Sequence, residues 1–248
     1  ENTYKLKANS KEKMVLLDKP SITNIPLKDI SKNGKWTPNH YSSDRFLAIE
    51  KLKTRHKANS KIVKLSDLVD FVTPLRKLEP LDDDSKCISV LHVINNDYLN
   101  IDDVMSYKPK YPGTRCLPGD LIFSKINPRI HRALIVPDLG YELCCSNEFE
   151  ILKEKNETDI FLIKILLSLP SVQAQINSLT SGTSSSHNRI KTDELKEIIV
   201  PLPKKTSSDG KKIYSTLKDY KKSYKAIYEQ RSAIYSSKLA LTTLFESN

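Results

Sequence analysis

The sequence predicts an α+β protein, in which a β-rich globular domain with short helices precedes one long, coiled-coil-like C-terminal helix. Short apolar runs separated by Pro and Gly turn signals fill the middle of the chain, which is typical of strands. The chain contains no Gly or Pro after Gly210, and its apolar residues there recur in a 4-3-4-3 rhythm typical of a long helix. We therefore expect an extended arm with a short helix at 1–60, a domain at 61–205 and the long helix at 206–248.

The first elements follow from local composition. Residues 1–30 are polar and rich in Lys, Asn and Ser, which predicts an extended arm. Residues 44–56 place apolar side chains along one side of a short amphipathic helix. Strands are then expected in the segments KIVKLSDLVDFVT, CISVLHVI, DLIFSKI, RALIVP and FEILK. The turn signals Pro112–Gly113 and Pro118–Gly119–Asp120 separate some of these strands.

Two helices and a last strand complete the domain. Thr158 is predicted to cap a helix that ends at Leu169, and Ser171 a second helix that ends at Leu179. The strand IIVPLP then ends at its two prolines, which mark a boundary.

The C-terminal helix, at about 35 residues, would be roughly 50 Å long. Its apolar seam is predicted to dock a partner or a second copy of the chain. The alternative is that the helix folds back and packs on its own domain. The seam consists of Ile213, Leu217, Tyr220, Tyr224, Ile227, Ile234 and Leu241.

Charge and composition narrow the function. The 40 Lys and Arg against 30 Asp and Glu give a net charge of +10. Such a balance suits a polyanionic partner, because Lys and Arg release condensed counterions when they contact phosphates, although charge also serves solubility. Cys87, Cys116, Cys144 and Cys145 form no C-x-x-C pair, so we expect no metal site and a cytoplasmic location. No apolar run reaches the ~20 residues needed to span a bilayer.

Several segments resemble, in order, the target recognition domain of Type I restriction-modification specificity (S) subunits. They are PGDLIFSKINP (Pro118–Pro128), CSNEFEIL (Cys145–Leu152) and SGTSSSHNRIKTDELKEIIVPLP (Ser181–Pro203). KIVKLSDLVDFV resembles the opening of such a domain. KWTPNHYSSDRFLAIEKLK resembles the segment that precedes it in single-domain members, with Trp36 and Thr37 in place of the more usual residues. The resemblance covers roughly residues 35–248 and corresponds to a half-subunit with one recognition domain and one spacer helix.

The resemblance implies sequence-specific recognition of double-stranded DNA and a set of partners. The chain would direct a DNA adenine methyltransferase subunit, and through it a restriction endonuclease subunit, to a target sequence. A homodimer could form through the C-terminal helix. S-adenosylmethionine and ATP with Mg would bind the partner subunits, and this chain would hold no cofactor. One alternative is the C-terminal specificity part of a single-polypeptide methyltransferase–endonuclease, which the start at Glu1 favours. A non-DNA coiled-coil interaction protein and a small nuclease are the others.

Two segments are predicted to contact DNA, since Ser, Thr and Lys suit phosphates whereas Arg and Asn can read base edges. The first comprises Thr183, Ser184, Ser185, Ser186, His187, Asn188, Arg189 and Lys191. The second, a turn between two strands, comprises Lys125, Asn127, Arg129, His131 and Arg132. Arg189 is the leading candidate for a base contact. A flexible Ser-rich loop and a solvated hairpin tip are the alternatives.

Other polar residues are weaker candidates for DNA contact. The segment 74–84 contains Arg76 but also an acidic triplet that would repel phosphates. His92 lies between apolar neighbours and fits a core-edge histidine better than a base reader.

Catalysis by this chain is not expected. A DNA adenine methyltransferase needs a glycine-rich cofactor loop and an N-P-P-Y-like motif, but the chain has no G-x-G and Asn127–Pro128 is followed by Arg129. The E-x-K of Glu194–Lys196 has no convincing partner carboxylate for a metal-dependent nuclease. We therefore predict a non-catalytic specificity subunit with no catalytic residues.

Overall fold

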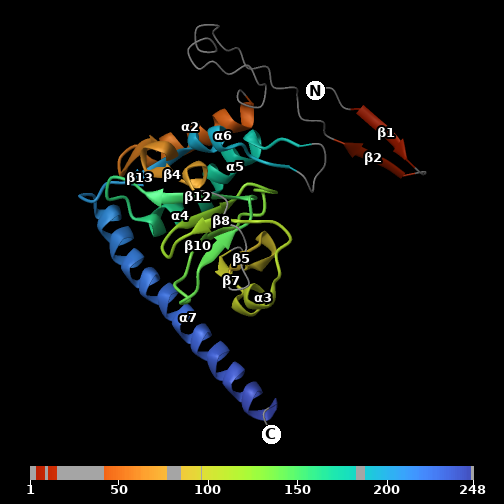
Figure 1. Ribbon diagram of the computed structural model, residues 1–248. Helices are drawn as coiled ribbons and strands as arrows, with labels where there is room; N and C mark the ends of the chain where they lie inside the picture. The colour runs from red at the N-terminus through yellow and green to blue at the C-terminus, as the bar shows by residue number, and fades with distance from the viewer. Residues whose placement is uncertain are drawn as a thin grey trace.

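The computed structural model describes residues 4–8, 11–15, 42–76, 85–95, 97–182 and 188–246. It confirms the α+β class: small sheets and short helices form a domain, and one long helix runs along its side and continues beyond it (Figure 1). Near the N-terminus, β1 (Tyr4–Ala8) and β2 (Lys11–Val15) pair as an antiparallel hairpin. The other residues before Ser42 lie outside the described part of the chain, and the predicted boundaries of the three parts stay predictions.

The largest sheet has the strand order β10-β9-β12-β4, with every neighbour antiparallel. Its strands are β4 (Val69–Phe71), β9 (Leu121–Ser124), β10 (Ala133–Ile135) and β12 (Phe149–Glu154). Every residue of β9 and β10 is buried, so this sheet forms the centre of the core. The predicted turn before β9 is confirmed: Gly119 has φ +91°, which glycine adopts without strain, and the Asp120 N–H donates to the Leu117 carbonyl at 3.0 Å.

A second sheet has the order β5-β11-β8 and holds all four cysteines, which are buried and free. Its strands are β5 (Lys86–Ile88), β8 (Thr114–Cys116) and β11 (Leu143–Cys145). Beside it lie the two-stranded pair β6 (Val93–Ile94) and β7 (Tyr98–Leu99) and the helix α3 (Ile101–Ser106), which was not predicted.

Two predicted long strands are each interrupted by a 3-10 turn. KIVKLSDLVDFVT forms β3 (Ser60–Lys64) and β4, separated by a turn in which the Asp67 carboxylate accepts a hydrogen bond from the Lys64 N–H at 3.2 Å. CISVLHVI forms β5 and β6, separated by a turn in which the Ser89 hydroxyl accepts from the Leu91 N–H. In both places a local side-chain bond to the backbone competes with strand pairing.

Helices and the last strand cover the sheet. α2 (Ser43–His56) packs on α5 (Pro170–Leu179), and β13 (Ile199–Pro203) pairs with β3 antiparallel. Two predicted caps were wrong by one or two residues. α4 (Ile160–Ser168) is capped by Asp159, whose carboxylate accepts from the Phe161 N–H at 3.0 Å, and α5 starts at Pro170, which needs no N–H donor at a first helical position. α6 (Thr192–Lys196) was not predicted.

The predicted long helix is α7 (Ser208–Glu246), with 39 residues. In Figure 1 its first part lies against the domain, whereas its last turns extend past the domain to the C-terminal end. Within the described residues, no single helix is long and apolar enough to cross a membrane; α4 and α5 reach that composition only as a pair bent by 75°.

Candidate nucleic-acid interface

Of the two segments that were predicted to contact DNA, residues 188–190 of the first and 125–127 of the second lie side by side in the fold, although about 60 residues separate them in the chain. Ile126, just after β9, forms an antiparallel β-bridge with Arg189. The Asn127 N–H donates to the Asn188 carbonyl at 2.7 Å, and the Ile190 N–H donates to the Lys125 carbonyl at 3.1 Å. These main-chain bonds join the second predicted segment to the first.

The Ser-rich segment starts and ends at one pair of hydrogen bonds. The Ser181 N–H donates to the Arg189 carbonyl at 3.0 Å, and the Arg189 N–H donates back to the Ser181 carbonyl at 2.8 Å. Thr183, Ser184, Ser185, Ser186 and His187 lie outside the described residues, so their predicted roles stay predictions. Asn188 is half-buried and Lys191 is exposed.

The turn at residues 125–132 connects β9 with β10. Asn127 has φ +45°, a left-handed conformation that asparagine tolerates better than most residues, and its carbonyl accepts from the Ile130 N–H at 2.8 Å. Arg129 is exposed at the tip, and Arg132 is half-buried. The turn therefore displays at least one guanidinium beside the Arg189 segment.

His131 faces the domain. The side-chain amide Nε2 of Gln173 donates to its Nδ1 at 2.9 Å, and its ring centroid lies 5.9 Å from that of Phe123. Burial lowers the pKa of His131 to about 4. The ring is therefore neutral at neutral pH and supplies no positive charge for a phosphate.

Arg189 is held by Glu148 on the neighbouring segment before β12. Its Nε donates to Oε2 at 3.0 Å, and its Nη2 donates to Oε1 at 2.6 Å, so the pair is bidentate. The hydrogen bonds and the charge of Glu148 raise the pKa of Arg189. The side chains stay 47% and 32% exposed, respectively, so the pair lies at the surface.

Lys125 is paired with a second carboxylate, that of Glu150, which lies in β12. The Glu150 side chain is 1% exposed, and its Oε2 accepts from Thr192 Oγ1 at 2.5 Å and lies 3.5 Å from Lys125 Nζ. Its Oε1 is buried and has no hydrogen-bond partner among the described residues. Lys125 is 20% exposed, so much of its charge is used within the protein.

Glu148 and Glu150 were missed as members of this site. Both lie within CSNEFEIL on either side of Phe149: Glu150 belongs to β12, whereas Glu148 lies in the turn before it. Their positions in or next to the expected strand were readable from the sequence. Their arginine and lysine partners were not, because the partners come from other segments of the chain.

The weaker candidates for DNA contact, Arg76 and His92, have structural roles. Arg76 donates from Nη1 to Asp120 Oδ2 at 2.5 Å and to the Arg115 carbonyl at 3.1 Å, in a pair whose side chains are 17% and 5% exposed. His92 is buried, and its Nδ1 accepts from the Ser89 N–H at 3.1 Å. In the described residues, no group of three or more His, Cys, Asp or Glu could hold a metal ion.

The first half of α7 is fixed to the domain by tyrosines. Tyr224 Oη donates to the Ile135 carbonyl at 3.3 Å, and Tyr228 Oη accepts from the Leu99 N–H at 2.8 Å. Tyr220 Oη accepts at 2.9 Å from Lys164, whose pKa is lowered by burial to about 8. Leu217 is also buried and belongs to the hydrophobic core, so this part of the seam packs on its own domain.

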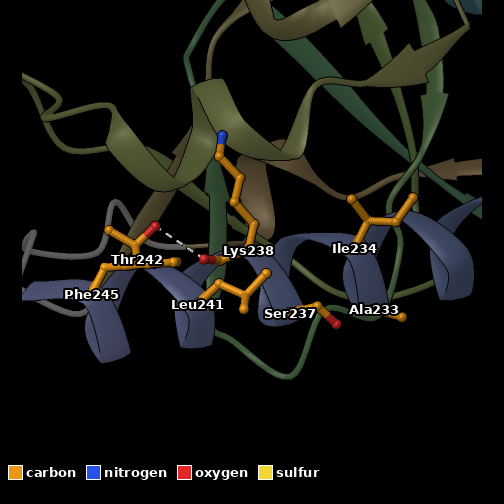
Figure 2. Close-up of a pocket in the computed structure, with 7 residues that line it drawn as sticks. All are labelled: Ala233, Ile234, Ser237, Lys238, Leu241, Thr242 and Phe245. Atoms are coloured by element: carbon orange, nitrogen blue, oxygen red, sulfur yellow. Dashed lines mark hydrogen bonds between the residues drawn. The ribbon is translucent and has the colours of Figure 1, made fainter.

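The last turns of α7 carry exposed apolar side chains. They are Ile234 (67% exposed), Leu239 (54%), Leu241 (57%), Leu244 (61%) and Phe245 (81%). Figure 2 shows Lys238 extending from the helix toward the domain, where its Nζ lies 3.9 Å from an Asp102 oxygen, while Ala233 and Ser237 point away. Of the other predicted seam residues, Ile213 is 41% exposed and Ile227 is half-buried.

No protein-family model and no curated protein matches the sequence. Among solved structures, the fold is similar to the S subunit of a Type I restriction-modification system from M. genitalium, with a TM-score of 0.43, 15% identity and coverage of 66% of this chain and 39% of that chain. It is also similar to the HsdS subunit from Thermoanaerobacter tengcongensis, with a TM-score of 0.40, 11% identity and coverage of 83% and 47%.

A third similar structure comes from work on the assembly and conformational transition of the type I R-M system, with a TM-score of 0.42, 11% identity and coverage of 87% and 53%. This chain therefore spans about half or less of the length of these three proteins. They are S subunits or come from type I systems, which is the family that the sequence segments resemble.

Proposed function

We propose that this chain is a sequence-specific DNA-binding module of a restriction-modification system. The observation that carries the proposal is the joining of two polar, basic segments, 125–132 and 188–191, into one surface by main-chain hydrogen bonds. Double-stranded DNA is recognised by side chains of this kind presented from an ordered backbone: phosphate contacts set the position, and base contacts set the sequence.

The sequence resemblance supports the same function through the placement of its segments. Residues 118–128 contain β9, residues 145–152 contain most of β12, and these strands pair directly. Residues 181–203 reach this pair through the Ile126–Arg189 bridge. The three segments that resemble a target recognition domain thus form one continuous piece of structure.

In this proposal, the roles of the basic residues differ. Arg129, Arg132 and Lys191 contact phosphates, because they lie at the turn or flank the Arg189 bridge. Asn188 and Arg189 read bases. His131 and Lys125 support the surface from below, since the first is neutral and the second is paired with Glu150.

The partners follow from the same proposal. The module directs a DNA adenine methyltransferase subunit, and an endonuclease subunit with it, while S-adenosylmethionine, ATP and Mg bind those subunits. The chain itself performs no catalysis. The exposed apolar residues on the last turns of α7 supply the docking surface for such a partner or for a second copy.

A salt titration of duplex binding tests the DNA proposal. The full chain is mixed with a random-sequence duplex, and log K is measured against log salt by fluorescence anisotropy. Each phosphate contact adds a slope of about −0.9. We expect a negative slope that corresponds to several contacts, and we expect Lys191→Ala to make this slope less steep by about 0.9. Binding that is no stronger than to a neutral polymer would reject the proposal and favour a coiled-coil interaction protein.

A double variant of α7 and a control variant test the docking surface. Ile234→Asp with Leu241→Asp places two charges on the exposed apolar side, and Ser236→Asp places one charge on another exposed side as the control. We expect the first variant to abolish self-association, or association with the methyltransferase subunit, in light scattering. Equal masses for both variants and the wild type, alone and with that subunit, would rule out this surface.

A further inference from the structure

Glu148 occupies only one side of the Arg189 guanidinium. A guanidinium has five N–H donors arranged in a plane, and two of its edges can bind an acceptor pair. Glu148 takes the edge formed by Nε and Nη2. The second edge, formed by Nη1 and the other N–H of Nη2, makes no hydrogen bond among the described residues, and the side chain is 47% exposed.

The backbone on both sides of the pair is held in place. The carbonyl of Glu148 accepts from the Lys125 N–H at 2.8 Å, and the adjacent Phe149 side chain is 1% exposed. The backbone N–H and carbonyl of Arg189 both form hydrogen bonds with the backbone of Ser181. Because two ordered backbone positions support the pair, the direction of the second guanidinium edge is set before any ligand binds.

The charge of the pair selects among ligands. A phosphate that approaches Arg189 also meets the carboxylate of Glu148, which repels it, and the pair is neutral as a whole. The O6 and N7 atoms of guanine carry no net charge and form an acceptor pair that matches a guanidinium edge. Guanine therefore suits the second edge better than a phosphate does.

We propose that Glu148 is a positioning residue, which holds Arg189 by its Nε–Nη2 edge so that the Nη1–Nη2 edge reads a guanine in the major groove. This inference rests on the proposed DNA-binding function. It makes Glu148 a determinant of specificity without direct contact to DNA. It also predicts that Arg189 contributes to sequence discrimination and little to the salt dependence of binding.

The test selects duplexes from a pool with a randomised central region, using the full chain, and sequences the bound fraction. We expect a wild-type motif that contains a guanine whose preference disappears in Arg189→Lys, since lysine keeps the charge but offers no planar edge. Replacing that guanine with 7-deazaguanine, which lacks the N7 acceptor, should weaken wild-type binding by about 5- to 150-fold and Arg189→Lys binding hardly at all.

Glu148→Gln separates positioning from simple structural support. It leaves Arg189 without its carboxylate partner, so that Arg189 can neutralise a phosphate. We therefore expect the salt slope on random duplex to steepen by about 0.9, while discrimination at the guanine falls. Glu142→Gln is the matched control, because Glu142 pairs with Arg115 through a 2.5 Å contact at an exposed position outside the site. The control should leave the guanine preference unchanged.

The outcomes distinguish failure of the proposed function from failure of this inference alone. A wild-type chain that selects no motif would reject the proposed function and this inference together. A selected motif without an Arg189-dependent guanine would overturn the inference and leave the function standing. Glu148→Gln with unchanged discrimination would also overturn it, because Arg189 would then need no positioning partner.

Discussion

Arg76 and Arg189 each form a bidentate pair with a carboxylate, and the two pairs differ in their surroundings. Arg76 meets Asp120 inside the domain, where the side chains are 17% and 5% exposed. Arg189 meets Glu148 at the surface, where the side chains are 47% and 32% exposed. Asp120 also accepts from the Leu117 N–H at 2.7 Å, and Arg76 also donates to the Arg115 carbonyl.

The comparison separates a structural pair from a pair that is available to a ligand. Arg76 spends donors on a main-chain carbonyl as well as on Asp120, and so ties the chain after β4 to the turn before β9. The Nη1–Nη2 edge of Arg189 makes no hydrogen bond among the described residues, and the side chain is 47% exposed. The same ion-pair chemistry therefore joins two parts of the domain in one place, and in our proposal it positions an arginine for DNA in the other.

The largest effect is expected at the buried pair. Asp120→Asn removes the charge but almost no volume, and it leaves Arg76 with a poorly compensated charge in the protein. We expect the free energy of unfolding to fall by about 3 kcal/mol, as measured by urea denaturation at pH 7. A loss below about 1 kcal/mol would show that Arg76 is solvated well enough to stand alone, which would remove the distinction between the two pairs.

The stability of the protein at low pH tests whether the His131 side chain, in the turn beside Arg189, is buried or exposed. Its pKa is about 4 in the folded chain against an ordinary value of 6.5, because burial disfavours the charged ring. Between pH 6.5 and 4 the unfolded chain binds a proton that the folded chain does not bind. The free energy of unfolding should therefore fall as the pH is lowered through this window, by about 2–3 kcal/mol.

The measurement compares urea denaturation of the wild type and His131→Asn from pH 7 to pH 4. Asparagine can still accept the hydrogen bond from Gln173 but does not titrate in this range. The difference between the two stability curves isolates the histidine from the carboxylates, which titrate in both proteins. Parallel curves would place His131 in solvent at the turn and return it to the candidates for phosphate contact.

The elements with a long, regular pattern were predictable from the sequence. The rhythm of apolar residues predicted α7, and short apolar runs bounded by turn residues predicted β9, β10, β12 and β13. α3 and α6 are short, so neither spans enough turns to show a helical period. The interruptions in two predicted strands were missed, because one backbone hydrogen bond accepted by the Asp67 carboxylate or the Ser89 hydroxyl outweighs a local strand preference.

The sequence named the basic residues of the candidate site, but it indicated neither Glu148 and Glu150 nor how the segments come together. The residue types of Arg189 and the 125–132 turn pointed to DNA. Their pairing depends on contacts between segments such as that of Arg189 with Glu148, which are 41 positions apart. No local pattern encodes such a contact, because it follows from the packing of β12 against β9 and of the Arg189 segment against Ile126. The seam on α7 was likewise readable as apolar, whereas its division into a packed and an exposed half was not.

The smallest effect on stability is expected at the exposed pair, and it sharpens the comparison most. Glu148→Gln should change the free energy of unfolding by no more than about 1 kcal/mol, because exposed ion pairs gain little over their hydration. When both proteins are denatured at 0.05 M and at 0.5 M salt, the difference between their free energies of unfolding should be smaller at 0.5 M, where exposed charges are screened. A loss as large as that of Asp120→Asn would make Glu148 a structural residue, and any loss of DNA discrimination in Glu148→Gln would then follow from a damaged surface. A small loss together with altered discrimination would locate the effect in the orientation of Arg189, since the domain beneath it would be unchanged.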